Sequence, residues 1–117
     1  MQAENEVDEF LSKTLSADLQ FDMYLLKGNI NLAQKNLMKA VDIFKKMLTD
    51  FPERSAKENI GLTLSVCYEE LKDYKSAIEI LEKLKASHPL PEYIDIRIHR
   101  LNDRLKNQPG ARGRYRK

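Results

Sequence analysis

The side chains that could support catalysis in this chain are two histidines, one cysteine and several neighbouring carboxylates. Glu69 and Glu70 are adjacent, and adjacent residues on a helix point about 100° apart, so they do not converge on one substrate. His88 precedes a proline and His99 falls on a polar helix face. Neither histidine has a serine or cysteine nucleophile beside it in a recognisable motif. We therefore expect no catalytic residue and no enzyme activity.

Cys67 is the single cysteine, which excludes an intrachain disulfide framework. One cysteine and two distant histidines are too few ligands for a zinc site. A reactive thiol needs positive charge nearby, whereas the nearest charged residues of Cys67 in the sequence are acidic, so a packed small side chain is expected. No glycine-rich segment has the spacing of a phosphate-binding loop. The sequence predicts no metal and no cofactor.

The composition is that of a folded, soluble protein of one domain. Apolar residues make up 42% and charged residues 32% of 117 residues, with a net charge of +2. The basic excess is local, because residues 92–117 carry 8 basic and 3 acidic side chains. The N-terminus is acidic and has no long apolar run, and no stretch is apolar enough to span a membrane. The expected location is cytoplasmic, without a membrane partner.

Apolar residues recur at helical spacing, and no segment alternates with the period of a strand, so the fold class is all-α. Ser16, Asn36 and Asp73 are expected N-caps, and Pro91 suits the first turn of a helix. The connections are short, so neighbouring helices should pack antiparallel. The expected helices cover about 4–15, 16–32, 36–51, 55–71, 73–88 and 91–106.

The start of the fourth predicted helix depends on one motif. Ser55 and Glu58 have the spacing of a capping box, in which the serine hydroxyl accepts from the Glu58 amide. The Glu58 carboxylate would reach back to the Ser55 amide. The sequence therefore predicts that this helix starts at Ser55.

An internal repeat organises the middle of the chain. The segment Ala40-Val41-Asp42-Ile43-Phe44 is similar to Ala77-Ile78-Glu79-Ile80-Leu81, and the period is 37 residues. A proline follows twelve residues after each alanine, as Pro52 and Pro89. Alanine lets two crossing helices approach closely, and proline stops the second helix. Each unit is therefore expected to be a helix, a tight turn and a second helix.

This pattern resembles the tetratricopeptide repeat family, whose unit is a helix pair of about 34 residues. The resemblance covers residues 21–89. The first unit departs from the family pattern at Asn31, where the second has Tyr68, and Leu37 stands where the second has Tyr74. Three extra residues separate the units, around Ser55. The positions that match are Gly28, Ser65, Tyr68, Tyr74, Ala40, Ala77, Phe44, Leu81, Pro52 and Pro89.

The resemblance implies an antiparallel helix-pair α-solenoid of five to six helices. Its repeats would cover about 21–54 and 58–91, with helices of about 4–15 and 91–106 as caps at either end. Alternatively, residues 91–106 are the first half of a third unit that lacks its second half. Residues 107–117 have no apolar periodicity and are predicted to form a flexible basic tail.

The family's concave groove, lined by the first helix of each unit, binds peptides or partner helices. By register, an apolar centre and polar edges are expected, which favours an amphipathic helix or an apolar peptide. Only Asn29 fits the pattern that some members use to bind a peptide carboxylate. The expected groove residues are Asp22, Leu25, Asn29, Leu32, Asn59, Leu62, Val66, Glu69, Asp95 and His99.

The sequence therefore favours a non-catalytic adaptor or scaffold that binds a protein partner, and two alternatives stay open. The first is a nucleic-acid or ribosome-associated factor that uses the basic C-terminal segment, through Arg112, Arg114, Arg116 and Lys117. The second is a homo-oligomerisation module, in which the groove or an open repeat end pairs two chains. The low net charge disfavours nucleic acid as a partner.

Overall fold

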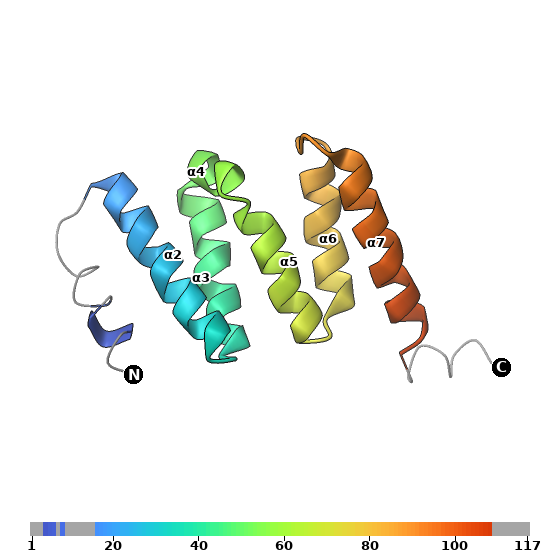
Figure 1. The fold of residues 1–117 in the computed structure, drawn as a ribbon, viewed down its shortest axis with the longest axis horizontal. Helices are drawn as coiled ribbons and strands as arrows, with labels where there is room; N and C mark the ends of the chain where they lie inside the picture. Colours follow the sequence, from blue (N-terminus) through green and yellow to red (C-terminus); the bar gives the residue numbers. More distant parts are fainter. Residues whose placement is uncertain (1–3, 7, 9–15, 109–117) are drawn as a thin grey trace.

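The computed structural model describes residues 4–6, 8 and 16–108, which contain helices and no strand. The all-α prediction is confirmed. The helices are α2 (Ala17–Ala33), α3 (Leu37–Asp50), α4 (Pro52–Lys57), α5 (Ile60–Glu70), α6 (Tyr74–Lys85) and α7 (Pro91–Lys106), in the order shown in Figure 1.

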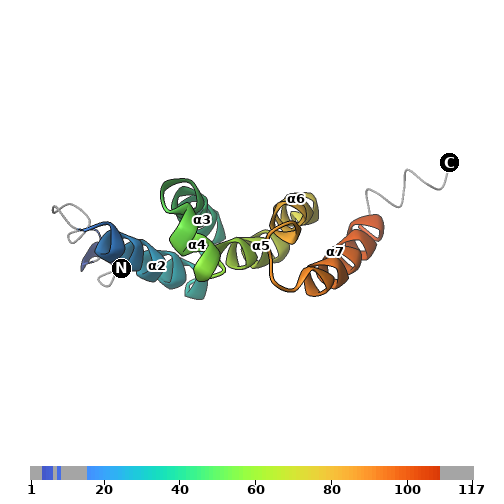
Figure 2. The same ribbon diagram turned by 90° about the horizontal axis from the view of Figure 1, so that it is seen from above.

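The helices form an extended array in which α2 packs against α3, α5 against α6 and α6 against α7, and α3 packs against α5 across the short helix α4. Viewed from above, α2, α5 and α7 lie in one row and α3 and α6 in a second row (Figure 2). The principal extents are 57 × 33 × 17 Å, as expected when repeated helix pairs stack in one direction. The antiparallel α-solenoid predicted from the repeat is confirmed.

Two of the three predicted N-caps form as expected. The Ser16 hydroxyl accepts from the Leu19 amide at 3.3 Å, and the Asp73 carboxylate accepts from the Ser76 amide at 3.2 Å. Asn36 occupies the N-cap position of α3, but its side chain makes no capping bond. Pro91 stands in the first turn of α7 as predicted, where a missing N–H costs nothing.

The predicted capping box at Ser55 is wrong. Ser55 lies inside the short helix α4 and is buried, and its hydroxyl donates to the Met47 carbonyl at 2.9 Å. The same carbonyl also accepts from the amide of Phe51, the C-cap residue of α3, at 2.8 Å, so the serine adds a second bond at the end of α3. The next long helix starts at Ile60, after Asn59 adopts a left-handed conformation with φ of 56°. The extra residues between the units are therefore a separate helical turn.

The core consists of two clusters of buried side chains. The first lies between α2, α3 and α5 and contains Phe21, Ala40, Val41, Phe44, Met47, Ile60, Leu64 and Cys67. The second lies between α6 and α7 and contains Ala77, Leu81, Ile94, Ile98 and Leu101. Tyr68 of α5 packs against both clusters, so α5 joins the two units.

Small residues set the distance between paired helices. A Cβ atom at Gly28 would lie 2.6 Å from Cε1 of the buried Phe44 ring, so α2 and α3 can approach this closely only because residue 28 is glycine. In the second unit, 37 residues later, Ser65 stands at the position of Gly28 and Leu81 stands at the position of Phe44. The unit with the smaller residue on its first helix, Gly28, has the larger residue on its second helix, Phe44, as close packing requires.

The departure of the first unit from the repeat pattern at Asn31 has a physical reason. Lys27 and Asn31 occupy the positions where the second unit has Leu64 and Tyr68, which pack against the preceding unit. Lys27 instead pairs with Asp8 of the N-terminal segment. Asn31 is completely buried, and its amide group donates to the Lys27 carbonyl at 2.9 Å. Polar contacts of the first unit therefore stand where the second unit has apolar packing.

The N-terminal segment is described only in part. Glu4–Glu6 and Asp8 are helical, and Glu4 is buried and accepts from Lys39 at 3.1 Å, which lowers the pKa of the Glu4 carboxyl. The rest of the helix predicted over 4–15 lies outside the described residues. At the opposite end, the outer side of α7 and the loop before it expose the large apolar side chains Leu90, Tyr93 and Ile96.

Candidate interaction surface

Helix α2 contributes four of the side chains predicted to line a groove. Leu25 and Leu32 are half-buried and pack against the first core cluster, whereas Asn29 is exposed. The Asp22 carboxylate accepts from Arg54 of α4 at 3.0 Å, and Arg54 also pairs with Asp18. Asp22 therefore fixes α4 against α2 in addition to facing solvent.

Helix α5 and the residue before it contribute the next four. Val66 is 39% exposed in the middle of the helix, although it is aliphatic. Leu62, one turn earlier, is half-buried and packs against the second core cluster. Asn59 is exposed at the start of the helix. A partner could thus contact an apolar strip that runs from Leu62 to Val66.

Glu69 lies in a small charge network between α5 and α7. Its carboxylate accepts from Arg97 at 3.3 Å and from Arg104 at 2.8 Å, and the side chains of Glu69 and Arg97 are only 26% and 15% exposed. These pairs tie the second unit to the last helix. Sequence reasoning missed both arginines, because nothing in the local pattern shows which residues of separate helices meet.

The two predicted residues of α7 face different surroundings. Asp95 accepts from Lys85 of α6 at 2.7 Å, and this bond raises the pKa of Lys85. Asp95 therefore lies at the contact between α6 and α7. His99 is exposed.

A hollow of about 470 Å³ brings two of the predicted residues together with α7. Val66 and Glu69 of α5 line it beside Tyr74 at the start of α6 and Arg104 of α7. Glu70 and Lys72 complete the lining, so four of its six residues are charged, and Val66 and Tyr74 supply its apolar part.

The groups that could have supported catalysis are placed as structural residues. Cys67 is completely buried, and burial, followed by the negative charge of Glu70, raises the pKa of its thiol to about 11. The His88 imidazole accepts from the Leu90 amide through Nδ1 at 2.9 Å. Within the described part of the chain, no three acidic, histidine or cysteine side chains gather closely enough to hold a metal ion.

The basic C-terminal segment is described as far as residue 108. Residues 92–108 contain four basic and three acidic side chains, a balance of +1. Two of the four basic side chains, Arg97 and Arg104, are paired with Glu69. The tail residues Arg112, Arg114, Arg116 and Lys117 lie outside the described residues.

None of the helices in the described part of the chain has both the length and the apolar character needed to cross a membrane. Comparison with protein-family models gave a match to one family, described as "Tetratricopeptide repeat", over residues 31–97. Searches of curated proteins and of solved structures gave no significant match.

Proposed function

Since the chain belongs to the tetratricopeptide repeat family, whose repeats mediate protein–protein interaction, we propose that it is an adaptor that holds a segment of a partner protein. The partner would bind along the row formed by α2, α5 and α7. Domains of this family are typically non-catalytic, in keeping with the absence of a nucleophile and base in a recognisable arrangement in the sequence.

The exposure of Val66 is the observation that carries this proposal. An aliphatic residue in the middle of a helix of the core is usually turned inward, yet Val66 keeps 39% of its surface exposed. Its neighbours on the same side are the half-buried Leu62 and the charged Glu69. An amphipathic helix or an apolar extended peptide could bury this strip and place its polar residues over the edges.

Leu25, Asn29 and Leu32 would extend the surface along α2. Asn29 offers an exposed amide between two half-buried leucines, so it could bond to the backbone or a polar side chain of the partner. His99 and Asn59 would provide polar contacts at other edges. Two repeats are long enough for one helix or a brief peptide and too short to wrap a large partner.

The experiment that tests the proposal compares two substitutions of equal exposure. Val66→Glu places a charge in the proposed groove, and Leu19→Glu places the same charge near the start of α2, at a leucine that is also 39% exposed and is not one of the proposed groove residues. The partner is captured from the native host with the whole chain and identified by mass spectrometry. Binding should be lost with Val66→Glu and kept with Leu19→Glu, while the helical circular dichroism of both variants stays unchanged.

Equal capture by both variants would reject the groove. Leu62 is less suitable for this test, because it packs against the second core cluster and a charge there would also destabilise the fold. Light scattering over a range of protein concentrations completes the design. A mass that rises with concentration in the native chain but not in Val66→Glu would identify a second copy of this chain as the groove's occupant.

A further inference from the structure

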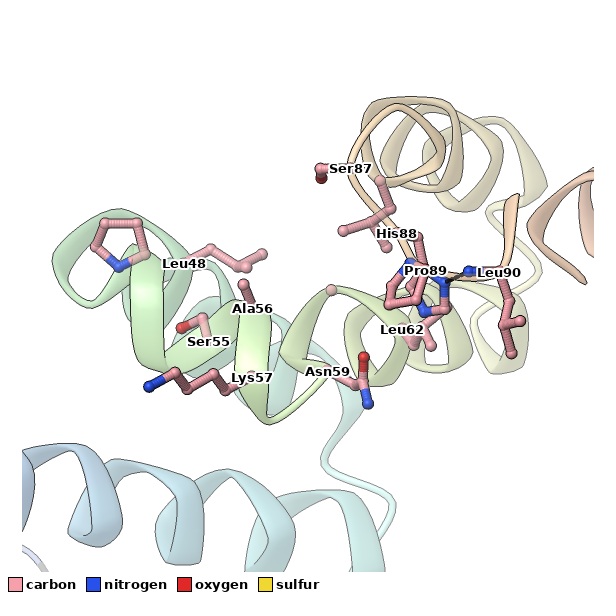
Figure 3. A pocket seen from close by; sticks show the side chains of 13 residues that line it. Leu48, Ser55, Ala56, Lys57, Asn59, Leu62, Ser87, His88, Pro89 and Leu90 are labelled. Atoms are coloured by element: carbon pink, nitrogen blue, oxygen red, sulfur yellow. Dashed lines mark hydrogen bonds between the residues drawn. The ribbon is translucent and has the colours of Figure 1, made fainter. Parts of the chain in front are cut away.

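A second concave site lies where the two repeats meet, around the first turn of α5. It is a cavity of about 480 Å³, within the range of about 300–1,000 Å³ typical of ligand pockets. Gly61 and Leu62 form its base, Leu48 and Ala56 line one side, and Leu84 and His88 line the other. Figure 3 shows Leu48 and Ala56 facing the cavity across from Ser87 and His88.

The cavity exists because the second repeat lacks an aromatic pair that the first repeat contains. At an offset of 37 residues, Gly61 corresponds to Tyr24 and His88 corresponds to Phe51. In the first repeat the rings of Tyr24 and Phe51 lie against each other, with centroids 6.3 Å apart. In the second repeat the glycine supplies no ring.

The space that the missing ring leaves is only partly refilled. Leu84 leans over Gly61, so that a Cβ atom added there would lie 2.8 Å from Leu84 Cδ2. Beyond Leu84 the space remains open, and helix α4, formed by the extra residues between the repeats, closes it on the other side through Ala56. The irregular features of the repeat therefore combine to build one pocket.

The polar groups at the edge of the cavity define what it can bind. The Nδ1 atom of His88 accepts from the Leu90 amide, so the neutral ring carries its proton on Nε2 and can donate to an oxygen atom. Lys57 is the one charged residue among those that line the cavity, and it forms no ion pair within the described part of the chain. Figure 3 shows its side chain extending from α4 on the side away from His88, so its ammonium group lies outside the cavity. The site therefore suits an aromatic ring with a hydroxyl, next to a negative charge.

We propose that this cavity binds the side chain of a tyrosine from a partner protein, and that an acidic residue beside that tyrosine pairs with Lys57. The incoming ring would occupy the open space beyond Leu84, which has no counterpart among the described residues of the first repeat. Its hydroxyl would accept from Nε2 of His88. The cavity shares Leu62 and Asn59 with the proposed groove, but Val66 does not line it, so substitutions at Val66 and at Ala56 distinguish the two.

The test is a nuclear magnetic resonance titration of the whole ¹⁵N-labelled chain with N-acetyl-Asp-Tyr-amide. We expect saturable shifts of the amide signals of Gly61, Leu62 and His88. N-acetyl-Lys-Tyr-amide should bind up to about fivefold more weakly, the range of an exposed ion pair. The difference between the two peptides should vanish in Lys57→Gln.

Two variants fill the cavity from opposite sides, and one serves as a control. Ala56→Phe and Ser87→Phe both replace exposed residues on the cavity walls, so at least one is expected to fold. Met38→Phe adds the same ring at an exposed position that does not line this cavity. The shifts should disappear in the filled variants and persist in Met38→Phe.

Three results would overturn the proposal: no saturable shifts at Gly61 and His88, shifts that persist in both filled variants, or equal binding of a peptide with cyclohexylalanine in place of tyrosine. The outcome is independent of the groove. Val66→Glu leaves the cavity lining intact and should not change the titration, so loss of partner capture by that variant and loss of peptide binding by Ala56→Phe report on different sites.

Discussion

Gly28→Ala tests whether the close approach of α2 and α3 depends on the missing side chain. The added Cβ atom would lie 2.6 Å from Cε1 and 2.8 Å from Cζ of Phe44, whose ring is completely buried. Overpacking of this kind costs about 1–3 kcal/mol. Alanine in a helix gains about 0.8–1.0 kcal/mol over glycine. The expected net effect is a loss of about 1 kcal/mol in the free energy of unfolding.

Urea unfolding, followed by circular dichroism, measures this loss, and Asn29→Ala is the control. Asn29 is the next residue of the same helix and is exposed, so its replacement should gain helix propensity without a clash. The second repeat, which has Ser65 and Leu81 at the positions of Gly28 and Phe44, suggests a rescue variant. Gly28→Ala combined with Phe44→Leu should lose at least about 1 kcal/mol less than the sum of the two single changes, because the smaller side chain admits the methyl group.

A stabilisation of about 1 kcal/mol by Gly28→Ala would refute the reasoning. It would mean that only helix propensity changed and that the Phe44 ring moves aside without a cost in free energy. Strict additivity of the double variant would lead to the same conclusion, since the two side chains would then not share one space.

Three further predictions concern single interactions. Lys72→Gly should stabilise the protein by about 0.5–1 kcal/mol in urea unfolding. The reason is that Lys72 adopts a left-handed φ of 63°, which costs a residue with a Cβ atom about 1–2 kcal/mol. An unchanged free energy of unfolding would show that the turn is unstrained. Glu69→Gln should lose about 1 kcal/mol at low salt and less at high salt, because it removes the charge shared by Arg97 and Arg104; a salt-independent loss would contradict this. The pKa of the Cys67 thiol is about 11 in the folded chain and about 9 in the unfolded chain, so the free energy of unfolding should fall as the pH rises from 9 to 11. The buried thiol should also react slowly with a thiol reagent at neutral pH. Rapid labelling of the folded chain would disprove the burial.

The helix pairs could be predicted because their signals are local. Ser16 and Asp73 each bond to an amide three residues away. Pro52 follows the last residue of α3 by two positions, and Pro89 follows the last residue of α6 by four. Helix α4 was missed although Pro52 begins it, which is the same first-turn signal that correctly placed Pro91. The spacing of Ser55 and Glu58 suggested a competing helix start, and only the tertiary structure shows that the serine hydroxyl bonds to Met47 instead.

The candidate surface was less predictable, because the partners of its charged residues come from distant segments. Arg54 follows Asp22 by 32 residues, and Arg104 follows Glu69 by 35. The register of the repeat placed these carboxylates on the first helix of each unit, but register contains no information on which cation of another helix reaches them. The cavity at Gly61 was missed for the opposite reason, since an absent side chain leaves no signal unless the two repeats are compared position by position.

The two ends of the array differ in how favourably a further helix pair could pack against them. An engineered consensus helix pair fused after α7 would meet Leu90, Tyr93 and Ile96 and could bury them. The same pair fused before α2 would meet Lys27, whose side chain is 22% exposed and paired with Asp8, and would have to bury that charge. Chimeras of this chain should therefore gain thermal stability when lengthened at the α7 end and lose it when lengthened at the α2 end.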